Sequence, residues 1–221
     1  MKIAKQFTAF LLVVALCAAF SGCSGTPAVS DEPAKANRFP LELKTVNGIM
    51  ENNGISLMAR DVQEQEPVEG VTQTVYILYS LDEESNESFG LAYSNRGEKG
   101  AGVGLALFPE KIGKTDADSE KLIKAALDLY GEFSDKQAIV DNVLKAAEKG
   151  DVRVYEDDGY NARTFYYLKA GGVNLTFDFV EQDGGYAVRR VEIMDDDMFS
   201  LSLEVNSDYA WAQDLQKELK K

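Results

Sequence analysis

The sequence contains no histidine, and this absence removes the usual general base and the usual nitrogen ligand of metal sites. Histidine-dependent catalytic triads and histidine-ligated zinc or iron are therefore excluded. The Gly-x-Ser-x-Gly pattern of serine hydrolases and the complete Gly-x-x-x-x-Gly-Lys-Ser/Thr pattern of phosphate-binding loops do not occur either. We accordingly predict no cofactor and no metal site, and the sequence assigns no catalytic residue.

Cysteine and positive charge are also scarce. The two cysteines, Cys17 and Cys23, both lie near the start of the chain, so the rest of the sequence can form neither a disulfide nor a thiolate metal site. The chain has 23 Lys and Arg against 37 Asp and Glu, a formal net charge of −14. This balance argues against a nucleic-acid-binding surface, which needs clustered basic side chains, and against a polybasic attachment to anionic lipid.

The beginning of the chain has the pattern of an export signal. Two lysines precede an apolar run over residues 7–20, which ends in Ser21-Gly22-Cys23. The run is shorter than the roughly 20 apolar residues that a membrane-spanning helix needs. A charged start, an apolar middle and a small-residue exit indicate a segment that is removed on maturation.

The ending Phe20-Ser21-Gly22-Cys23 resembles the lipobox of bacterial lipoproteins, with Phe20 where the family usually has Leu. The resemblance implies that residues 1–22 are a signal peptide, that the thiol of Cys23 is lipidated, and that 221 − 22 = 199 residues remain. The removed segment carries two lysines and no acid, so the mature charge is −14 − 2 = −16. The family is held by acyl chains such as palmitate on the extracytoplasmic face of the cell membrane. An ordinary secretory signal cleaved after Ala19 is the alternative.

The composition of residues 23–221, which follow the predicted signal peptide, divides them into two parts. Residues 23–38 carry Gly, Pro and Ser without apolar periodicity, and we predict a flexible tether there. Residues 39–221 are predicted to form a single α+β domain. Two Asn-Gly pairs, at Asn47 and Asn53, predict turns, and the acidic stretch Asp61–Gly70 predicts a loop. Alternation of apolar and polar residues predicts the strands of the first half, at 41–44, 55–60, 71–80, 89–93 and 103–107.

The apolar period changes from two to 3.6 in the middle of the chain, which predicts a helical hairpin. The first helix is expected from about Thr115 to Phe133. The second opens at Ser134, where Ser134 and Gln137 have the spacing of a capping box, and ends at Gly150.

Strand patterns resume after this hairpin. Adjacent Arg189 and Arg190 break the alternation and indicate a bulge. Asn206 or Ser207 is expected to cap a final helix with Trp211 on its apolar face. The strands of the second half are predicted at 152–154, 165–167, 173–179, 186–194 and 199–205.

This order of elements predicts an α+β fold. Tight turns between consecutive strands give antiparallel β meanders, with a central helical hairpin and a C-terminal helix packed on the sheet. The helix–helix–meander order from Thr115 to Val205 resembles the repeat unit of β-lactamase-inhibitor-like proteins and of small envelope-assembly lipoproteins, in element order alone. On one predicted strand, Gly102, Gly104 and Ala106 share a face, which indicates that something packs closely against it.

Acidic clusters are candidate cation sites because Ca²⁺ prefers oxygen ligands. Asp116-x-Asp118-x-Glu120 begins like a calcium-binding loop, but Lys121 stands where that loop needs glycine. We expect these acids to be solvated rather than to form a metal site. The other clusters are Asp157-Asp158 and Asp195-Asp196-Asp197.

Aromatic residues are the remaining candidates for a site. Phe165, Tyr166, Tyr167 and Tyr186 are expected in the core or in cross-strand pairs, with a sugar or peptide groove as the alternative. We therefore predict a membrane-anchored extracytoplasmic lipoprotein that serves as a non-catalytic binding or envelope-support module. Its expected partners are the membrane, through the lipid on Cys23, and an envelope protein or a glycan. The alternatives are a carboxylate-based hydrolase of envelope glycans and a small-ligand or cation sensor.

Overall fold

The computed structural model describes residues 28–80, 87–97, 100–106, 116–156, 163–182 and 184–220. The predicted signal peptide, Cys23 and the pair Asp157-Asp158 lie outside these ranges. The helices are α2 (Leu43–Asn52), α4 (Asp116–Tyr130), α5 (Lys136–Lys149), α6 (Asp196–Val205) and α7 (Ala210–Leu219). The strands are β1 (Lys35–Ala36), β2 (Leu57–Val68), β3 (Val71–Ser80), β4 (Glu87–Asn95), β5 (Ala101–Ala106), β6 (Gly131–Glu132), β7 (Arg153–Tyr155), β8 (Arg163–Ala170), β9 (Val173–Gln182) and β10 (Gly185–Met194).

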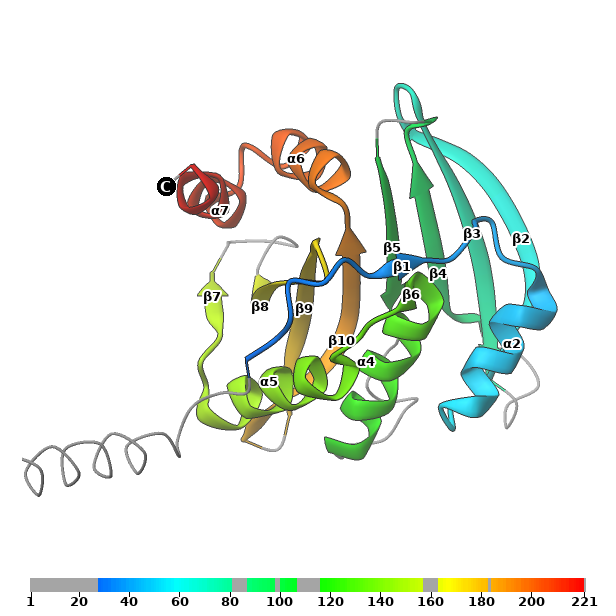
Figure 1. Ribbon diagram of the computed structural model, residues 1–221, viewed down its shortest axis with the longest axis horizontal. Helices are drawn as coiled ribbons and strands as arrows, with labels where there is room; N and C mark the ends of the chain where they lie inside the picture. Colours follow the sequence, from blue (N-terminus) through cyan, green and yellow to red (C-terminus); the bar gives the residue numbers. More distant parts are fainter. Residues whose placement is uncertain are drawn as a thin grey trace, which may run out of the picture.

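Eight strands form one antiparallel sheet in the order β2-β3-β4-β5-β10-β9-β8-β7 (Figure 1). The order describes two four-strand meanders that meet at their last strands, where Val103 of β5 pairs with Ile193 of β10. Each meander follows helical structure, α2 before the first and the α4–α5 hairpin before the second. The predicted α+β fold with antiparallel meanders and a central helical hairpin is confirmed.

One face of the sheet packs against α2, α4 and α5 (Figure 1). The alternating residues Leu175 and Phe177 of β9 point into this core and are fully buried, as are Leu122 and Leu127 of α4. The predicted cap of α5 is confirmed, because Gly150 ends the helix in the left-handed conformation with φ +66°.

The opposite face of the second meander is covered by α6 and α7. Their apolar side chains form a second cluster with Phe165 of β8, which is fully buried. Trp211 of α7 meets Phe165 edge-on at 6.2 Å between ring centroids, and Phe199 of α6 stacks on Tyr167 at 5.6 Å. These helices bury strand positions that would otherwise face solvent.

The segment before α2 differs from the free tether predicted over residues 23–38. Residues 30–37 lie along the helical layer, and we call this segment the N-terminal strap (Figure 1). Its strand β1 pairs with β6, which links α4 to α5. The backbone N–H of Ala34 donates to the carbonyl of Gly171 at 2.8 Å, and Ala34 packs on the core. Val29, just before the strap, also packs against the core.

Three predicted elements are wrong. The first, a strand at 41–44, is the start of helix α2, which buries Val46 and Met50 at helical spacing. Asn47 lies inside this helix rather than in a turn. Its side chain exchanges hydrogen bonds with the backbone N–H and C=O of Ala59, at 2.7 and 3.1 Å, and so holds β2 where its register shifts.

The second is the loop predicted over Asp61–Gly70. Strand β2 continues to Val68, because it pairs with β3 from Leu57 to Val68 with register shifts at Arg60 and at Glu66-Pro67. Polar side chains suit this position because β2 is an edge strand, where charge discourages pairing with other chains. Tyr79 on β3 donates to the carboxylate of Asp61 at 2.7 Å across this pair.

The third is the strand predicted over 199–205, which is helix α6. The apolar alternation also fits a helix that buries Phe199 and Leu203 while leaving Val205 54 % exposed. Asp195 caps the helix, because its side chain accepts a hydrogen bond from the N–H of Met198 at 2.8 Å. Asp196 then lies in the first turn, where a negative charge is favoured by the helix dipole.

The predicted helix caps at Ser134, Asn206 and Ser207 are also wrong. Asp135 precedes α5 and Tyr209 precedes α7, and neither side chain caps its helix. By contrast, the predicted bulge in β10 is confirmed, because the register to β9 shifts between Val188 and Arg190.

Candidate functional site

A pocket of about 210 Å³ opens between the sheet and α6. Its floor comes from β4 and β5, one side from Met198 and neighbouring residues of α6, and the other from Pro67 and Val68 at the end of β2. Most of its lining is apolar, with a few polar groups. Such a combination is typical of small-molecule sites. The polar residues in the lining are Gln73, Ser94, Glu192, Ser202 and Asn206.

Small residues make the floor of this pocket. A Cβ atom at Gly102 would lie 2.9 Å from Cγ of Met194 and 3.3 Å from Cγ of Met198, so α6 packs directly on this glycine. The close packing predicted from this strand face is confirmed there. At Gly104 the nearest atom to such a Cβ is 3.9 Å away, so the space above this glycine belongs to the pocket.

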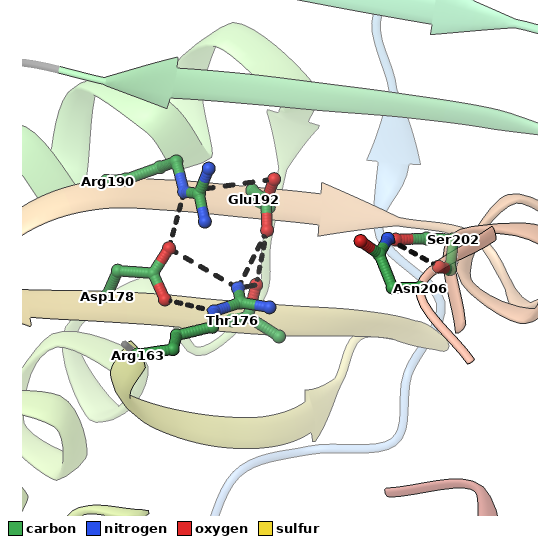
Figure 2. Close-up of polar contacts among 7 residues, drawn as sticks. All are labelled: Arg163, Thr176, Asp178, Arg190, Glu192, Ser202 and Asn206. Carbon is green, nitrogen blue, oxygen red and sulfur yellow. Dashed lines mark hydrogen bonds and ion pairs between the residues drawn. The ribbon is translucent and has the colours of Figure 1, made fainter. Parts of the chain in front are cut away.

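Asp195 positions the α6 wall of the pocket relative to the floor. One carboxylate oxygen accepts the hydrogen bond from Met198, and the other accepts from the backbone N–H of Ala101 at 2.6 Å. The same side chain therefore ties the start of α6 to the start of β5. Within α6, the amide of Asn206 donates to the carbonyl of Ser202 at 2.7 Å, which closes the last turn beside the pocket (Figure 2).

Glu192 connects the pocket to a network of charged side chains on β8, β9 and β10 (Figure 2). Its Oε2 accepts hydrogen bonds from Nη2 of Arg163 and from the hydroxyl of Thr176, each at 3.0 Å. Its Oε1 lies 3.9 Å from Nε of Arg190 and accepts no hydrogen bond from the described residues. Oε1 is therefore the oxygen with spare acceptor capacity beside the pocket.

Asp178 is the centre of the same network and is 1 % exposed. Arg163 contacts both of its oxygens, and Nε of Arg190 donates to Oδ2. Two arginines and two carboxylates thus compensate each other, with Arg163 and Asp178 buried and Arg190 and Glu192 partly exposed. A buried charge that is paired and hydrogen-bonded in this way avoids most of the cost of an isolated one.

The network keeps Glu192 ionised. Burial would raise the pKa of this carboxyl, but attraction by Arg190 and Arg163, with hydrogen bonds from Thr176 and Arg163, lowers the pKa overall. The neighbouring negative charge of Glu192 in turn raises the pKa of Arg190. The pocket therefore has an ionised carboxylate, paired with two arginines, at one point of a mostly apolar lining.

Arg163 also joins the network to the second hydrophobic cluster. Its guanidinium carbon lies 4.3 Å from the ring centroid of Trp211 and 4.7 Å from that of Phe165. Cation–π contacts at such distances hold the guanidinium in place. Trp211 is the single tryptophan of the chain, so its fluorescence is a natural reporter for this region.

The structure places the predicted candidates as follows. Phe165 is in the core, Tyr167 stacks on Phe199, and Tyr186 meets Phe179 edge-on, in agreement with the expected packing role of the aromatic residues. Within the described ranges, no three potential metal-ligating side chains come together. Cys23, the predicted lipidation site, lies outside those ranges.

The charged network is the part of the site that the sequence did not predict. Thr176 and Asp178 alternate with apolar residues and look like the solvated side of a strand. The one signal was the disturbed alternation at Arg189 and Arg190. Comparison with protein-family models, curated proteins and solved structures finds no match. In the part of the chain that the structure describes, no helix has the length and apolar character needed to cross a membrane.

Proposed function

We propose that the protein is a lipid-anchored, extracytoplasmic binding module whose ligand site is the pocket between β5 and α6. The anchor would be the lipid on Cys23 that the lipobox resemblance implies. The observation that carries the binding site is the free space above Gly104, which lies beside an ionised Glu192. An envelope protein or glycan segment with matching chemistry is the expected partner.

The lining defines the chemistry of the ligand. An apolar body of a few carbon atoms suits the volume of about 210 Å³. Oε1 of Glu192 is able to accept a hydrogen bond from a ligand, so a donor group, preferably a positively charged one, is favoured at that end of the pocket. The negative net charge, −14 for the full chain and −16 without residues 1–22, likewise attracts cations and repels anions. A small amphiphile or side chain with an ammonium head is therefore the proposed ligand class.

Binding is favoured over glycan hydrolysis at this site. Hydrolysis by paired carboxylates needs a general acid, whose pKa is raised so that it can donate a proton. The pKa of Glu192 is lowered instead, and Asp178 is enclosed by two arginines. Both carboxylates therefore serve charge compensation rather than proton transfer.

Three probes with the same six-carbon tail test this function. Hexylamine, hexanol and hexanoate are titrated into the mature protein, and binding is followed by melting temperature and by fluorescence of Trp211. We expect a saturable rise in melting temperature with hexylamine, a smaller one with hexanol and none with hexanoate, because a ligand stabilises the state that binds it.

Two leucine substitutions on β5 provide the control. Gly104→Leu fills the pocket without backbone contact and should abolish the saturable shift. Ala106→Leu adds a similar side chain on the same strand face, outside the pocket lining, and should preserve it. Equal shifts in both variants, or equal binding of hexanoate and hexylamine, would contradict the proposed site.

A further inference from the structure

We propose that the N-terminal strap orients the domain on the membrane, with α5 and the β8–β9 turn toward the bilayer and the β2–β3 hairpin away from it. The proposal rests on the lipid anchor at Cys23 described above. It adds a surface that meets the lipid, which the anchor alone does not specify.

The strap is held along its whole length. At its beginning, the N–H of Ser30 donates to the carboxylate of Asp135 at 2.8 Å, and the carbonyl of Ser30 accepts from Gly171 at 3.3 Å. At its end, the amide of Asn37 donates to the carbonyls of Asp128 and Leu129 at 2.9 and 3.0 Å. These contacts come from α4, from Asp135 just before α5, and from the β8–β9 turn.

Two glycines allow this close approach. A Cβ at Gly131 would overlap the carbonyl of Lys35, so only glycine lets β1 lie against β6. Gly171 has φ +59°, and a Cβ there would lie 2.9 Å from the ring of Phe133 and 3.1 Å from Ala34. The domain surface is thus shaped to receive the strap.

The strap shortens the connection between the anchor and the domain. A free connection from Cys23 to Phe39 would have 39 − 23 = 16 residues and reach about 55 Å. From Cys23 to Ser30 there are 30 − 23 = 7 residues, with a reach of about 25 Å at full extension. Ser30 therefore stays close to the bilayer.

The width of the sheet, compared with the reach of this short connection, determines which edge of the domain lies near the membrane. Ser30 contacts the β8–β9 turn, and β2 lies five strand positions from β9 in the sheet. At about 4.8 Å per position, this separation is roughly 24 Å, as long as the fully stretched connection. Only full extension would let β2 reach the membrane, and chain entropy disfavours full extension.

Charge favours the same orientation. The exposed part of the β2–β3 hairpin carries four acids and one base, whereas α5 carries three lysines and two acids. Anionic lipid headgroups repel the acidic hairpin and are indifferent to the mixed helix. The hairpin acids are Asp61, Glu64, Glu66 and Glu69.

The test uses the mature protein, in which Cys23 is the only thiol. Cys23 is coupled chemically to a maleimide lipid in phosphatidylcholine vesicles that also contain a lipid with a photoreactive diazirine on its headgroup. Cross-linked peptides are identified by mass spectrometry. We expect several-fold more cross-links from residues 134–149 and 168–172 than from residues 61–71.

Three variants test whether the short connection and the bound strap cause the cross-linking bias. A flexible spacer of about twenty residues inserted after Ser24 lengthens the connection and should remove the bias. The same spacer at the C-terminus is the matched control and should preserve it. Asn37→Ala, which leaves the sheet core intact, should loosen the strap and weaken the bias.

Each outcome decides the proposal. An even distribution in the unaltered protein, or a bias that survives the N-terminal spacer, would overturn the orienting role of the strap. Because the coupling is chemical, these results do not depend on whether cells lipidate Cys23. An unmodified N-terminus in the native protein would instead overturn the proposed anchor.

Discussion

Arg163 and Asp178 form a buried, two-point ion pair across adjacent strands, with Nε 2.5 Å from Oδ1 and Nη2 3.3 Å from Oδ2. Their side chains are 8 % and 1 % exposed. The pair connects the pocket to the packing of α7, because Arg163 also contacts Glu192 at the pocket and Trp211 of α7. A substitution of either partner should therefore alter both the position of Glu192 at the pocket and the packing of α7.

Asp178→Asn should destabilise the protein by about 3–5 kcal/mol, because it leaves Arg163 buried without its main compensating charge. The free energy of unfolding from urea titration, followed by fluorescence of Trp211, measures the change. The matched control is Glu132→Gln, which breaks the ion pair between Lys35 and Glu132, both 79 % exposed. The control should change stability by less than about 0.5 kcal/mol. Similar losses in the two variants would show that the buried pair has no special role.

Stability should fall in acid partly through Glu192. The pKa of this carboxyl is lowered in the folded protein from an ordinary value of 4.5, so the folded state binds its proton less tightly than the unfolded state does. Its contribution is therefore present above pH 4.5 and is lost as the pH falls below that value.

The measurement compares unfolding free energies of the wild-type protein and Glu192→Gln between neutral pH and pH 3. The difference between them should shrink as the pH falls, because protonated Glu192 no longer attracts the two arginines. A difference that is the same at every pH would mean that the charge of Glu192 does not stabilise the fold.

Most of the sheet could be predicted from the sequence, because its strands follow the period of two. Val173, Leu175, Phe177 and Phe179 show it most clearly, and all four face the core. The start of β2 was predicted, but its continuation from Asp61 to Val68 was missed because an edge strand does not need an apolar side. Its exposed residues have the composition of a loop, and only pairing with β3 makes them a strand.

The pocket could not be predicted because it depends on α6, and the charged network could not be predicted because its residues meet only across β8, β9 and β10. Phe199, Leu201, Leu203 and Val205 alternate as in a strand, whereas helix α6 buries only Phe199 and Leu203 of these four, so the alternation favoured the wrong period. Asp195 was the local sign of a helix start.

The strap could not be predicted either, because its sequence has no periodicity. Its binding comes mostly from backbone groups and from the two glycines that receive it. The small residues on β5 were a correct sign of close packing at Gly102. Whether the space above Gly104 is filled or empty depends on the distance to α6, which the sequence does not contain.

Cys23→Ala should release the protein from the membrane or leave its signal peptide uncut, since the lipobox resemblance makes this thiol the point of attachment. Membrane fractionation and mass spectrometry of the N-terminus measure both outcomes. Cys17→Ala, inside the predicted signal peptide, is the control and should remain lipidated and membrane-bound. A mature wild-type chain that begins after Cys23 without lipid would contradict the prediction.

The three consecutive acids Asp195, Asp196 and Asp197 should act as a structural cap rather than as a calcium site. Asp195→Ala removes two hydrogen bonds, to Met198 and to Ala101, and should cost about 1–2 kcal/mol of unfolding free energy. Asp197→Ala, an exposed neighbour whose side chain has no hydrogen bond on the described chain, should cost only a few tenths.

Calcium itself provides the last test of this region. The carboxylate of Asp196 is held by Lys169 at 2.8 Å and by the amide of Asn174 at 2.8 Å, and hydrogen bonding by Lys169 and Asn174 lowers its pKa. Calcium needs six or more converging oxygens, and those of Asp195 are already used. Millimolar Ca²⁺ should therefore raise the melting temperature no more than Mg²⁺ does, through general screening of the negative charge. A saturable shift specific to Ca²⁺ and abolished by Asp196→Asn would instead establish a cation sensor.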